Sequence, residues 1–369
     1  MKEGWEYRRF ESCLIKVSKQ VQVKSKDYKK EGKFPIVSQE AELISGYWDD
    51  EAIVYKHKEP VVIFGDHTKN IKYVDFDFVV GADGTHILST KNDIEPKFFY
   101  YVLKSIKLRE LGYARHYKLL KEKYIPVPPL SEQQSIVDYL DSAFAKIVAM
   151  KANAENAINE AKALFQASLK EMLEPKEGWE EKKLEDITEV KDGTHDSPKY
   201  VTEGIPFVTQ KNITINGFDL LNTKKITLED HKKFYTRSNV EFGDIIIAMI
   251  GANRGMSCIV DTQEIFSIKN VGLIKKNDNI NMRYLLFYLH SPSANTYILD
   301  NSNGGAQEFI GLKGLRTFPI PYPPLSEQQS IVTTLDSLKS KVDRLQANFE
   351  KISQECDALK QAILRQVFE

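Results

Sequence analysis

An internal repeat constrains this chain of 369 residues more than any other sequence feature. Residues 125–137 read Ile-Pro-Val-Pro-Pro-Leu-Ser-Glu-Gln-Gln-Ser-Ile-Val, and residues 320–332 repeat them with one difference, Val127 against Tyr322. A shorter echo, Lys-Glu-Gly-Trp-Glu, begins at Lys2 and again at Lys176. A repeat on this scale determines architecture before any single motif does. The chain is therefore predicted to consist of two half-repeats.

Each repeated segment is predicted to begin a long helix. Ser131 and Ser326 are the predicted N-caps, each followed three residues later by a glutamine as in a capping box. Apolar residues then recur at alternating spacings of four and three over about 131–173 and 326–368, which is typical of a heptad seam. The predicted seam comprises Ile136, Leu140, Ile147, Met150 and Leu164 in the first helix, and Ile331, Leu335, Leu338, Val342, Leu345, Phe349, Ile352 and Leu359 in the second.

The two helices are predicted to pair with each other in antiparallel orientation. The first seam is rich in Ala and the second in Leu, Val and Phe, so a small surface faces a large one. A parallel pair would force the globular segment between the helices back along about 65 Å of helix. A single stripe could instead belong to an ordinary helical hairpin, but two stripes in identical register favour the long pair.

The predicted fold class is α/β, with two globular domains joined by the two long antiparallel helices in a pseudo-twofold internal repeat that puts the domains at opposite ends of a rod. Within the domains, strands are predicted at 60–66, 73–80, 205–208 and 244–251, and helices at 97–108 and 282–290. The predicted boundaries are 1–128 for the first domain, 129–175 for the first helix, 176–323 for the second domain and 324–369 for the second helix.

Cysteine usage and hydropathy favour a reducing compartment. The three cysteines are widely spaced and odd in number, which argues against a disulfide framework or a metal knuckle. The start of the chain lacks the apolar core of a signal peptide, and no apolar run is long enough to span a bilayer. We expect a cytoplasmic protein without membrane contact.

Motifs for catalysis are missing from the sequence. An adenine methyltransferase needs Asn or Asp before Pro-Pro and an aromatic residue, whereas the two Pro-Pro pairs here follow Val127 and Tyr322. The segment 305–313 has the wrong spacing for a phosphate loop. The seven histidines show no metal-ligand spacing. No catalytic residue, metal or cofactor is predicted in this chain.

The repeated Pro-Pro-Leu-Ser-Glu-Gln-Gln-x-Ile start of a long helix, placed after each globular segment, resembles the specificity (S) subunit of Type I restriction-modification systems. Shorter motifs resemble target recognition domain sequence and lie at 64–69, 81–84, 112–118, 192–200, 204–208, 243–246 and 304–307. The resemblance covers essentially the whole chain, and the proline-preceded helices are its most specific part.

The resemblance implies a non-catalytic subunit that binds double-stranded DNA. Each recognition domain would read one half of a bipartite, asymmetric site, and the helices would measure the unread spacer. The helices would also dock two modification (methyltransferase) subunits, which bind S-adenosylmethionine and methylate adenine at N6. Restriction/translocase subunits would join the full complex.

Charge is nearly balanced, with 51 basic and 52 acidic residues, but it is unevenly distributed. Residues 1–128 hold 23 basic and 19 acidic residues, whereas 129–177 hold 5 and 8. Residues 178–323 hold 17 and 18, so the second domain must rely on local placement of its cations to hold phosphates. The lysine run from Lys16 to Lys33 is interpreted as a solvated face that contributes phosphate contacts at best.

Candidate base-reading residues combine Arg, His, Lys or Asn with glycine-containing turns, which bring side chains to a groove. They are Arg115, His116 and Lys118, then His67, Thr68 and Lys69, in the first domain, and Thr194, His195, Lys199, Lys211, Asn212, Asn253 and Arg254 in the second. Each could instead cap a turn or stabilise its domain.

Two other interpretations stay open at the sequence level. The chain could be the specificity chain of a Type IIB-like enzyme, in which one partner both cuts and methylates. It could also be a coiled-coil scaffold that does not bind DNA, because the net charge of -1 offers no general attraction to nucleic acid. The bases read and the spacer length are not predicted.

Overall fold

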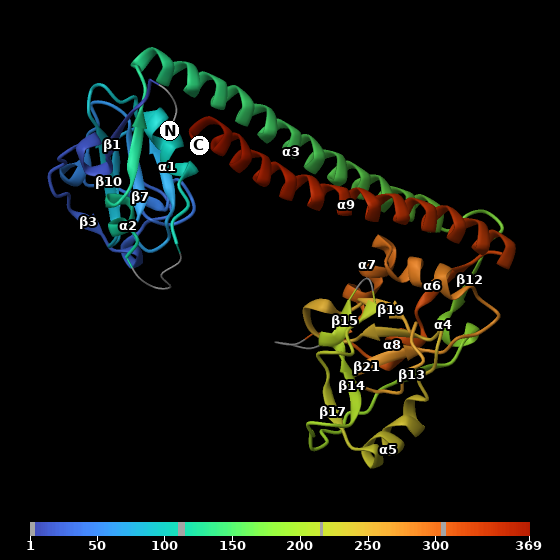
Figure 1. Cartoon of the computed structure of the whole chain (residues 1–369). Coiled ribbons are helices and arrows are strands. Elements are labelled where there is room, and N and C mark those ends of the chain that lie inside the picture. Colours follow the sequence, from blue (N-terminus) through green and yellow to red (C-terminus); the bar gives the residue numbers. More distant parts are fainter. Residues whose placement is uncertain (1–3, 110–114, 215–216, 304–307) are drawn as a thin grey trace. The chain divides into compact units, whose positions relative to one another are not determined.

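The chain forms two units, and each unit combines residues from distant parts of the sequence. The first unit comprises residues 1–155 and 349–369, and the second comprises 156–348. The structure is a computed structural model that describes residues 4–109, 115–214, 217–303 and 308–369. Each unit contains one domain with sheets and segments of both long helices (Figure 1).

The domain of the first unit is built from three sheets. A four-stranded sheet has the order β2-β10-β7-β8, a second sheet has the order β3-β9-β4-β5 with β6 also paired to β9, and β1 pairs with β11. Its elements are β1 (Glu6–Arg9), β2 (Leu14–Ile15), β3 (Gln22–Val23), β4 (Phe34–Val37), β5 (Gly46–Trp48), β6 (Val54–Tyr55), β7 (Val61–Gly65), β8 (Ile71–Val74), β9 (Phe78–Gly81), β10 (Thr85–Thr90), α1 (Pro96–Ser105), α2 (Tyr117–Lys121) and β11 (Tyr124–Val127).

The domain of the second unit repeats the main features of the first. Its four-stranded sheet has the order β13-β21-β18-β19, a three-stranded sheet has the order β17-β14-β20, and β12 pairs with β24. Its elements are β12 (Glu180–Lys183), α4 (Leu184–Ile187), β13 (Val190–Asp192), β14 (Ile205–Thr209), β15 (Ile213–Thr214), β16 (Gly217–Phe218), β17 (Lys224–Ile226), α5 (Leu228–Ser238), β18 (Ile245–Ala248), β19 (Ser257–Ile259), β20 (Ser267–Lys269), β21 (Val271–Ile274), α6 (Met282–Leu289), α7 (Pro292–Asp300), β22 (Ser302–Asn303), β23 (Phe309–Ile310), α8 (Leu312–Arg316) and β24 (Pro319–Tyr322).

Most predicted strands and helices are confirmed, and one is wrong. Strands β7, β14 and β18 and helices α1 and α6 occupy their predicted places. The single strand predicted at 73–80 is two strands, because β8 pairs with β7 in one sheet whereas β9 pairs with β4 in another. Asp77 lies where the chain passes between the sheets, and its carboxylate accepts hydrogen bonds from the backbone and side chain of His57.

The two long helices, α3 (Leu130–Leu173) and α9 (Leu325–Phe368), have 44 residues each and pair in antiparallel orientation. In the first unit, the beginning of α3 shares a core with the end of α9, through Leu140 and Phe368 among others. In the second unit, the end of α3 shares a core with the beginning of α9, through Leu173 and Leu335 among others. The predicted fold class is confirmed.

Nine of the thirteen predicted seam residues are buried or half-buried, and four are exposed. Leu140, Ile147, Ile331 and Leu335 are buried, and Ile136, Leu338, Val342, Phe349 and Ile352 are half-buried. Met150, Leu164, Leu345 and Leu359 are 57%, 62%, 39% and 46% exposed, so these four assignments to the seam are wrong. In α3 the chain instead turns Phe144, Ile158 and Phe165 inward, because these side chains cover more apolar area than the alanines of the predicted row.

Both long helices begin one residue earlier than predicted. The amides of Glu132 and Gln133 donate to the carbonyl oxygen of Pro129 at 2.9 and 3.0 Å, and Pro324 receives the equivalent bonds in the second repeat. Ser131 and Ser326 therefore lie inside the first turn and are not N-caps. The following glutamines, Gln133 and Gln328, are the residues that reach back, and both are fully buried.

In each half of the chain, the Lys-Glu-Gly-Trp-Glu motif contacts the long repeated segment (125–137 or 320–332) of the same half. Trp5 Nε1 donates to Glu132 at 2.9 Å, and Trp179 Nε1 donates to Glu327 at 3.1 Å. The one difference between the long repeats also has a contact: the hydroxyl of Tyr322 donates to the carbonyl oxygen of Asn279. Each domain is thereby joined to the start of the long helix that follows it.

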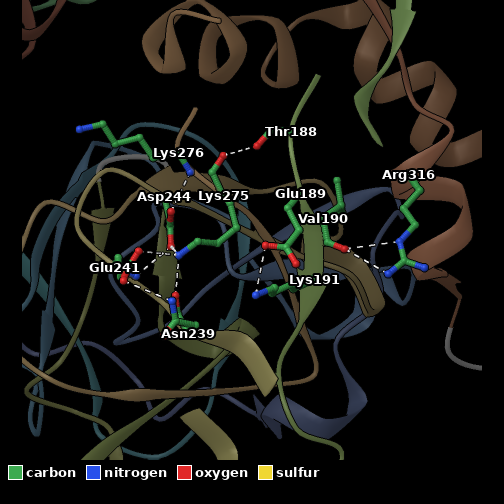
Figure 2. A network of polar contacts seen from close by, with 10 residues as sticks. All are labelled: Thr188, Glu189, Val190, Lys191, Asn239, Glu241, Asp244, Lys275, Lys276 and Arg316. Atoms are coloured by element: carbon green, nitrogen blue, oxygen red, sulfur yellow. Dashed lines mark hydrogen bonds and ion pairs between the residues drawn. The ribbon is translucent and has the colours of Figure 1, made fainter. Parts of the chain in front are cut away.

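A buried ion pair holds the four-stranded sheet of the second domain together (Figure 2). Asp244 is fully buried and accepts bonds from Lys275 Nζ at 2.6 Å and from the amides of Glu241 and Lys276 at 2.8 Å each. Burial opposes the charge of Lys275, but the carboxylates of Asp244 and Glu241 outweigh it and raise the pKa of Lys275. Hydrogen bonding to Lys275 lowers the pKa of Glu241.

Replacing Asp244 by Ala is expected to lower the free energy of unfolding of the second unit by about 3–5 kcal/mol, because Lys275, only 12% exposed, loses its buried partner and keeps only the exposed carboxylate of Glu241. Urea unfolding followed by Trp179 fluorescence, in a chain with Trp5 and Trp48 replaced by Phe, measures this. Glu241→Ala is the matched control. Because Glu241 is 58% exposed, its replacement should lower the free energy of unfolding by less than about 1 kcal/mol. Equal losses from both variants would contradict a buried pair. The contribution of this network to the free energy of unfolding is complete at pH values between the ordinary pKa values of Glu (4.5) and Lys (10.5). It decreases at lower pH, where Glu241 is protonated, and at higher pH, where Lys275 loses its proton.

No helix within the described ranges is long and apolar enough to cross a membrane. The three cysteines, Cys13, Cys258 and Cys356, are buried and free of disulfides. Among the described residues, no group of three His, Cys, Asp or Glu side chains is arranged to hold a metal ion.

Candidate nucleic-acid interface

Several predicted residues of the first domain meet in one cluster of loops at the end of β7. Gln39 connects these loops: its amide nitrogen donates to the carbonyl of Asp83 at 2.9 Å, and its side-chain oxygen accepts from the amide of His67 at 3.1 Å. The hydroxyl of Thr68 donates to the carbonyl of Gln39 at 2.5 Å. Lys69 follows in the left-handed conformation, with φ 59°. We call residues 39, 66–69, 83–84 and 115–118 the first loop cluster.

Asp66 fixes the part of this cluster that carries Arg115. Its side chain is buried, accepts from the amide of Tyr117 at 2.7 Å, and lies 3.9 Å from Arg115 Nε. The Arg115 side chain is 76% exposed, so most of its guanidinium faces solvent while its Nε lies near Asp66. His116 is 1% exposed and bonds to the carbonyl of Asp66 at 3.0 Å. The prediction of a reading role is therefore corrected for His116, which positions the loop. Lys118 is exposed.

Three lysines of the second domain line one pocket of about 360 Å³, which we call the lysine pocket. Lys211 follows the central strand β14, Lys224 begins β17 on one side of it, and Lys269 ends β20 on the other. The three-stranded sheet therefore brings together cations that are far apart in sequence. The pocket is completed by Tyr200, Phe207, Thr209, Gln210, Asn212, Asn222, Ile250 and Asn270.

The charge of the lysine pocket favours an anion. None of the described residues that line it is acidic, although the surrounding domain has slightly more acidic than basic residues. Lys224 Nζ lies 4.2 Å from the centre of the Tyr200 ring, and Lys269 Nζ donates to Ser197 at 2.7 Å. Like charges repel one another, so such a grouping is costly unless an anion occupies it. A phosphate backbone beside an exposed aromatic ring fits these groups.

Other predicted residues of the second domain border this pocket with different roles. Thr194 is 5% exposed and joins the backbone of β20, and Asn212 is 8% exposed and accepts from the amide of Thr209 at 3.0 Å. We correct the prediction for both, because their buried side chains hold loops. His195 is exposed, and its ring bonds to Asn270 at 2.8 Å and to Asp192 at 2.9 Å. Lys199 is exposed next to Tyr200.

Asn253 and Arg254 do not join the lysine pocket. Both line a separate pocket of about 420 Å³, formed with the α6–α7 junction and with Gln166 of α3. Asn253 is exposed, but the Arg254 side chain is only 13% exposed and pairs with Glu308. The predicted base-reading role of Arg254 is therefore replaced by a role in stabilising its loop. The glycine motifs at 112–114 and 304–307 lie outside the described residues.

Lys224, Lys269, Asn270 and Asn222 were missed by the sequence-based prediction. Lys269 ends β20, and Asn270 separates it from the apolar strand β21, which marks a strand-to-strand turn. Asn270 adopts the left-handed conformation of such a turn, with φ 53°. That signal locates the turn, but the neighbouring strands were needed to show that Lys211 and Lys224 lie beside it.

The fold and the two polar sites define a class of protein: two similar domains, each with its own cationic loops, attached to a shared pair of long helices. Comparison with known families agrees. The model for the type I restriction modification DNA specificity domain matches residues 2–160 and 176–354, once for each half. The chain belongs to this family.

Curated relatives carry the same description. The EcoBI type I restriction enzyme specificity subunit of Escherichia coli is 23% identical over 74% of this chain, and the match spans 65% of that relative, slightly under two thirds. The EcoR124I/EcoR124II specificity subunit of Escherichia coli is 25% identical over 85% of this chain and 81% of the relative.

Solved structures share the fold. A chain from a study of complex assembly and conformational transition of the type I R-M system covers 100% of this chain and 98% of its own length, at TM-score 0.71 and 19% identity. The HsdS subunit from Thermoanaerobacter tengcongensis covers 100% and 97%, at TM-score 0.58 and 19% identity.

Proposed function

We propose that this chain is the DNA sequence-specificity subunit of a Type I restriction-modification complex. Its recognition domains, residues 1–128 and 176–323, each read one half of a bipartite, asymmetric site, and the helices at 129–175 and 324–369 set the unread spacer between them. It acts in the cytoplasm, where its DNA substrate lies. The chain itself performs no catalysis.

The observation that carries this proposal is the repetition of one framework with two different polar surfaces. The domains join their helices through matching contacts, Trp5 to Glu132 and Trp179 to Glu327. The exposed groups differ, with Arg115 on buried Asp66 in the first domain and three lysines around Tyr200 in the second. Equal frameworks with unequal reading surfaces suit a site whose two halves differ in sequence.

Selection of bound duplexes from a random library by the complete complex tests the proposal. We expect enrichment of two short sequence blocks at a constant distance, separated by positions without preference. A coiled-coil scaffold that does not read DNA would enrich nothing, and its residual binding would fall with salt equally for all sequences. That outcome would contradict the proposal.

The partners are two modification subunits, which hold S-adenosylmethionine and methylate adenine at N6, together with restriction/translocase subunits in the complete assembly. An apolar stripe beside the seam is a suitable docking surface for the modification subunits. Its exposed members are Met150 and Leu359 in the first unit and Leu164 and Leu345 in the second. In an antiparallel pair, equivalent positions that flank the seam fall on the same side of both helices. Each unit therefore offers one apolar patch, which suits one modification subunit per unit.

Replacing Leu164 and Leu345 together by Glu is expected to remove one of the two modification subunits, because charge is introduced at the centre of one patch. Light scattering of the purified complex should show a mass lower by one modification subunit. Val148→Glu is the matched control, because Val148 is exposed to a similar degree, 55%, but occupies the opposite flank of the seam. Retention of both subunits by the double variant would contradict docking at this stripe.

A further inference from the structure

A buried glutamine joins each domain to its long helix, and its contacts go beyond what the start of a helix needs. Gln133 is fully buried. Its side-chain nitrogen donates to the carbonyls of Pro128 at 2.8 Å and Asp93 at 2.9 Å, and its oxygen accepts from the amide of Glu95 at 2.8 Å. One amide group thereby connects the last strand of the domain, the loop before α1 and the first turn of α3.

The second unit repeats the arrangement with Gln328. Its nitrogen donates to the carbonyl of Pro323 at 2.8 Å, and its oxygen accepts from the amide of Asn281, directly before α6, at 2.8 Å. The third contact is replaced: the carbonyl of Asn279 accepts from Tyr322 instead of from the glutamine. The same junction is thus maintained in both halves even where a residue has changed.

Two more contacts in each unit surround the glutamine. The tryptophan–glutamate bond lies one residue before it on the long helix. An aspartate eight residues after it pairs with the first turn of the domain helix, Asp141 with Lys97 at 2.7 Å and Asp336 with Arg283. The three contacts lie at different angles around the first three turns of the helix, which leaves the domain little freedom to tilt. We call these contacts, with the glutamine at their centre, the domain clamp.

A small tilt of one domain on its helix would change the distance between the two half-sites that the domains can bind together. A domain of about 130 residues has a radius of gyration of about 14 Å, so its far surface lies roughly 30 Å from its base. A tilt of about 7° at the base then moves that surface by roughly 3.4 Å, which is one base-pair step. The clamp therefore has to hold the domain within a few degrees if only one spacer length is to be accepted.

We propose that Gln133 and Gln328 are positioning residues that restrict the complex to a single spacer length. This inference rests on the proposed function, because a spacer exists only if the two domains read separate half-sites. The helices set the approximate spacer length, and the domain clamp excludes spacers that are one base pair shorter or longer. The glutamines do not contact DNA, so the bases read in each half-site should not depend on them.

Gln328→Met tests the proposal, since methionine keeps the volume of glutamine and removes its hydrogen bonds. The full complex is given duplexes with the two wild-type half-sites and spacers from two base pairs shorter to two longer. We expect methylation of spacers one base pair off to rise at least tenfold relative to the original spacer. Gln133→Met should do the same from the first domain. Gln134→Met is the control and should leave the profile unchanged, because this exposed side chain bonds to Asp138 within its own helix.

A spacer profile as sharp as that of the wild type, in a variant that still methylates, would overturn the proposal. Loss of methylation at every spacer by both variants, with the complex still assembled, would also overturn it, because the glutamines would then be required for reading. If Gln328→Met fails to fold, Trp179→Phe replaces it, since this change removes the bond to Glu327 and keeps an aromatic ring against the core. This variant must then broaden the spacer profile. A wild-type complex without any two-part site would refute the proposed function itself, which separates the two failures.

Discussion

Deleting residues 151–157 from α3 and 347–353 from α9 is expected to shorten the recognised spacer and to leave both half-site sequences unchanged. Each deletion removes one heptad, so both seams keep their register. Seven residues of helix span about 10 Å, and one base pair occupies about 3.4 Å, so the spacer should shorten by up to about three base pairs. Methylation of duplexes with fixed half-sites and variable spacers measures the change.

Deletion of the heptad from α3 alone is the control. It keeps the heptad register but makes α3 about 10 Å shorter than α9. The cores that the two helices share at their two ends then cannot both form, so we expect loss of the complex instead of a new spacer. An unchanged spacer in the double deletion would show that the helices do not measure the site.

Replacing Lys211, Lys224 and Lys269 together by Ala is expected to weaken binding of the complex to DNA by about two orders of magnitude at physiological salt. The three lysines surround one pocket that has no acidic residue among its described lining. If each neutralises one phosphate, the slope of log K against log salt should become shallower by about 2.7. Binding measured between about 50 and 200 mM salt gives this slope.

The matched control replaces Lys183, Lys232 and Lys313, three exposed lysines of the same domain that do not line the pocket. The two variants have the same net charge. An equal loss of affinity in both would show that total charge determines binding and would contradict a phosphate site in the lysine pocket.

The sequence predicted the parts of this fold that depend on local order. Two identical proline-preceded helix starts and two heptad stripes were sufficient for the antiparallel pair. The exact seam was not, because both Met150 and Ile158 satisfy an apolar spacing, and only the volume available between the helices decides that Ile158 is buried. The residue type of Ser131 predicts an N-cap, whereas the nearby Gln133 makes the tertiary contacts.

The candidate interface was less predictable because it depends on distant segments. Polar residues near glycine turns were chosen as exposed groups, yet His116 and Thr194 are buried and hold the turns themselves. Arg115 is 76% exposed because Asp66 approaches only the Nε of its guanidinium, at 3.9 Å. Lys224 carries no local signal and Lys269 marks only a turn; they become a site only because β17 and β20 flank β14.

The balanced total charge of 51 basic and 52 acidic residues is compatible with DNA binding because the charges are segregated. Phosphate contacts need only a few well-placed cations, and the lysine pocket places three without acidic neighbours in its described lining. The long helices carry a slight excess of acidic residues and an apolar stripe, which suits a surface that contacts protein.

Methylome sequencing of cells that carry this chain with its modification subunits tests the central claim most directly. The account predicts methylated adenines in a motif of two different short sequences separated by a spacer of constant length. A continuous motif, or methylation that does not depend on the presence of this chain, would contradict it.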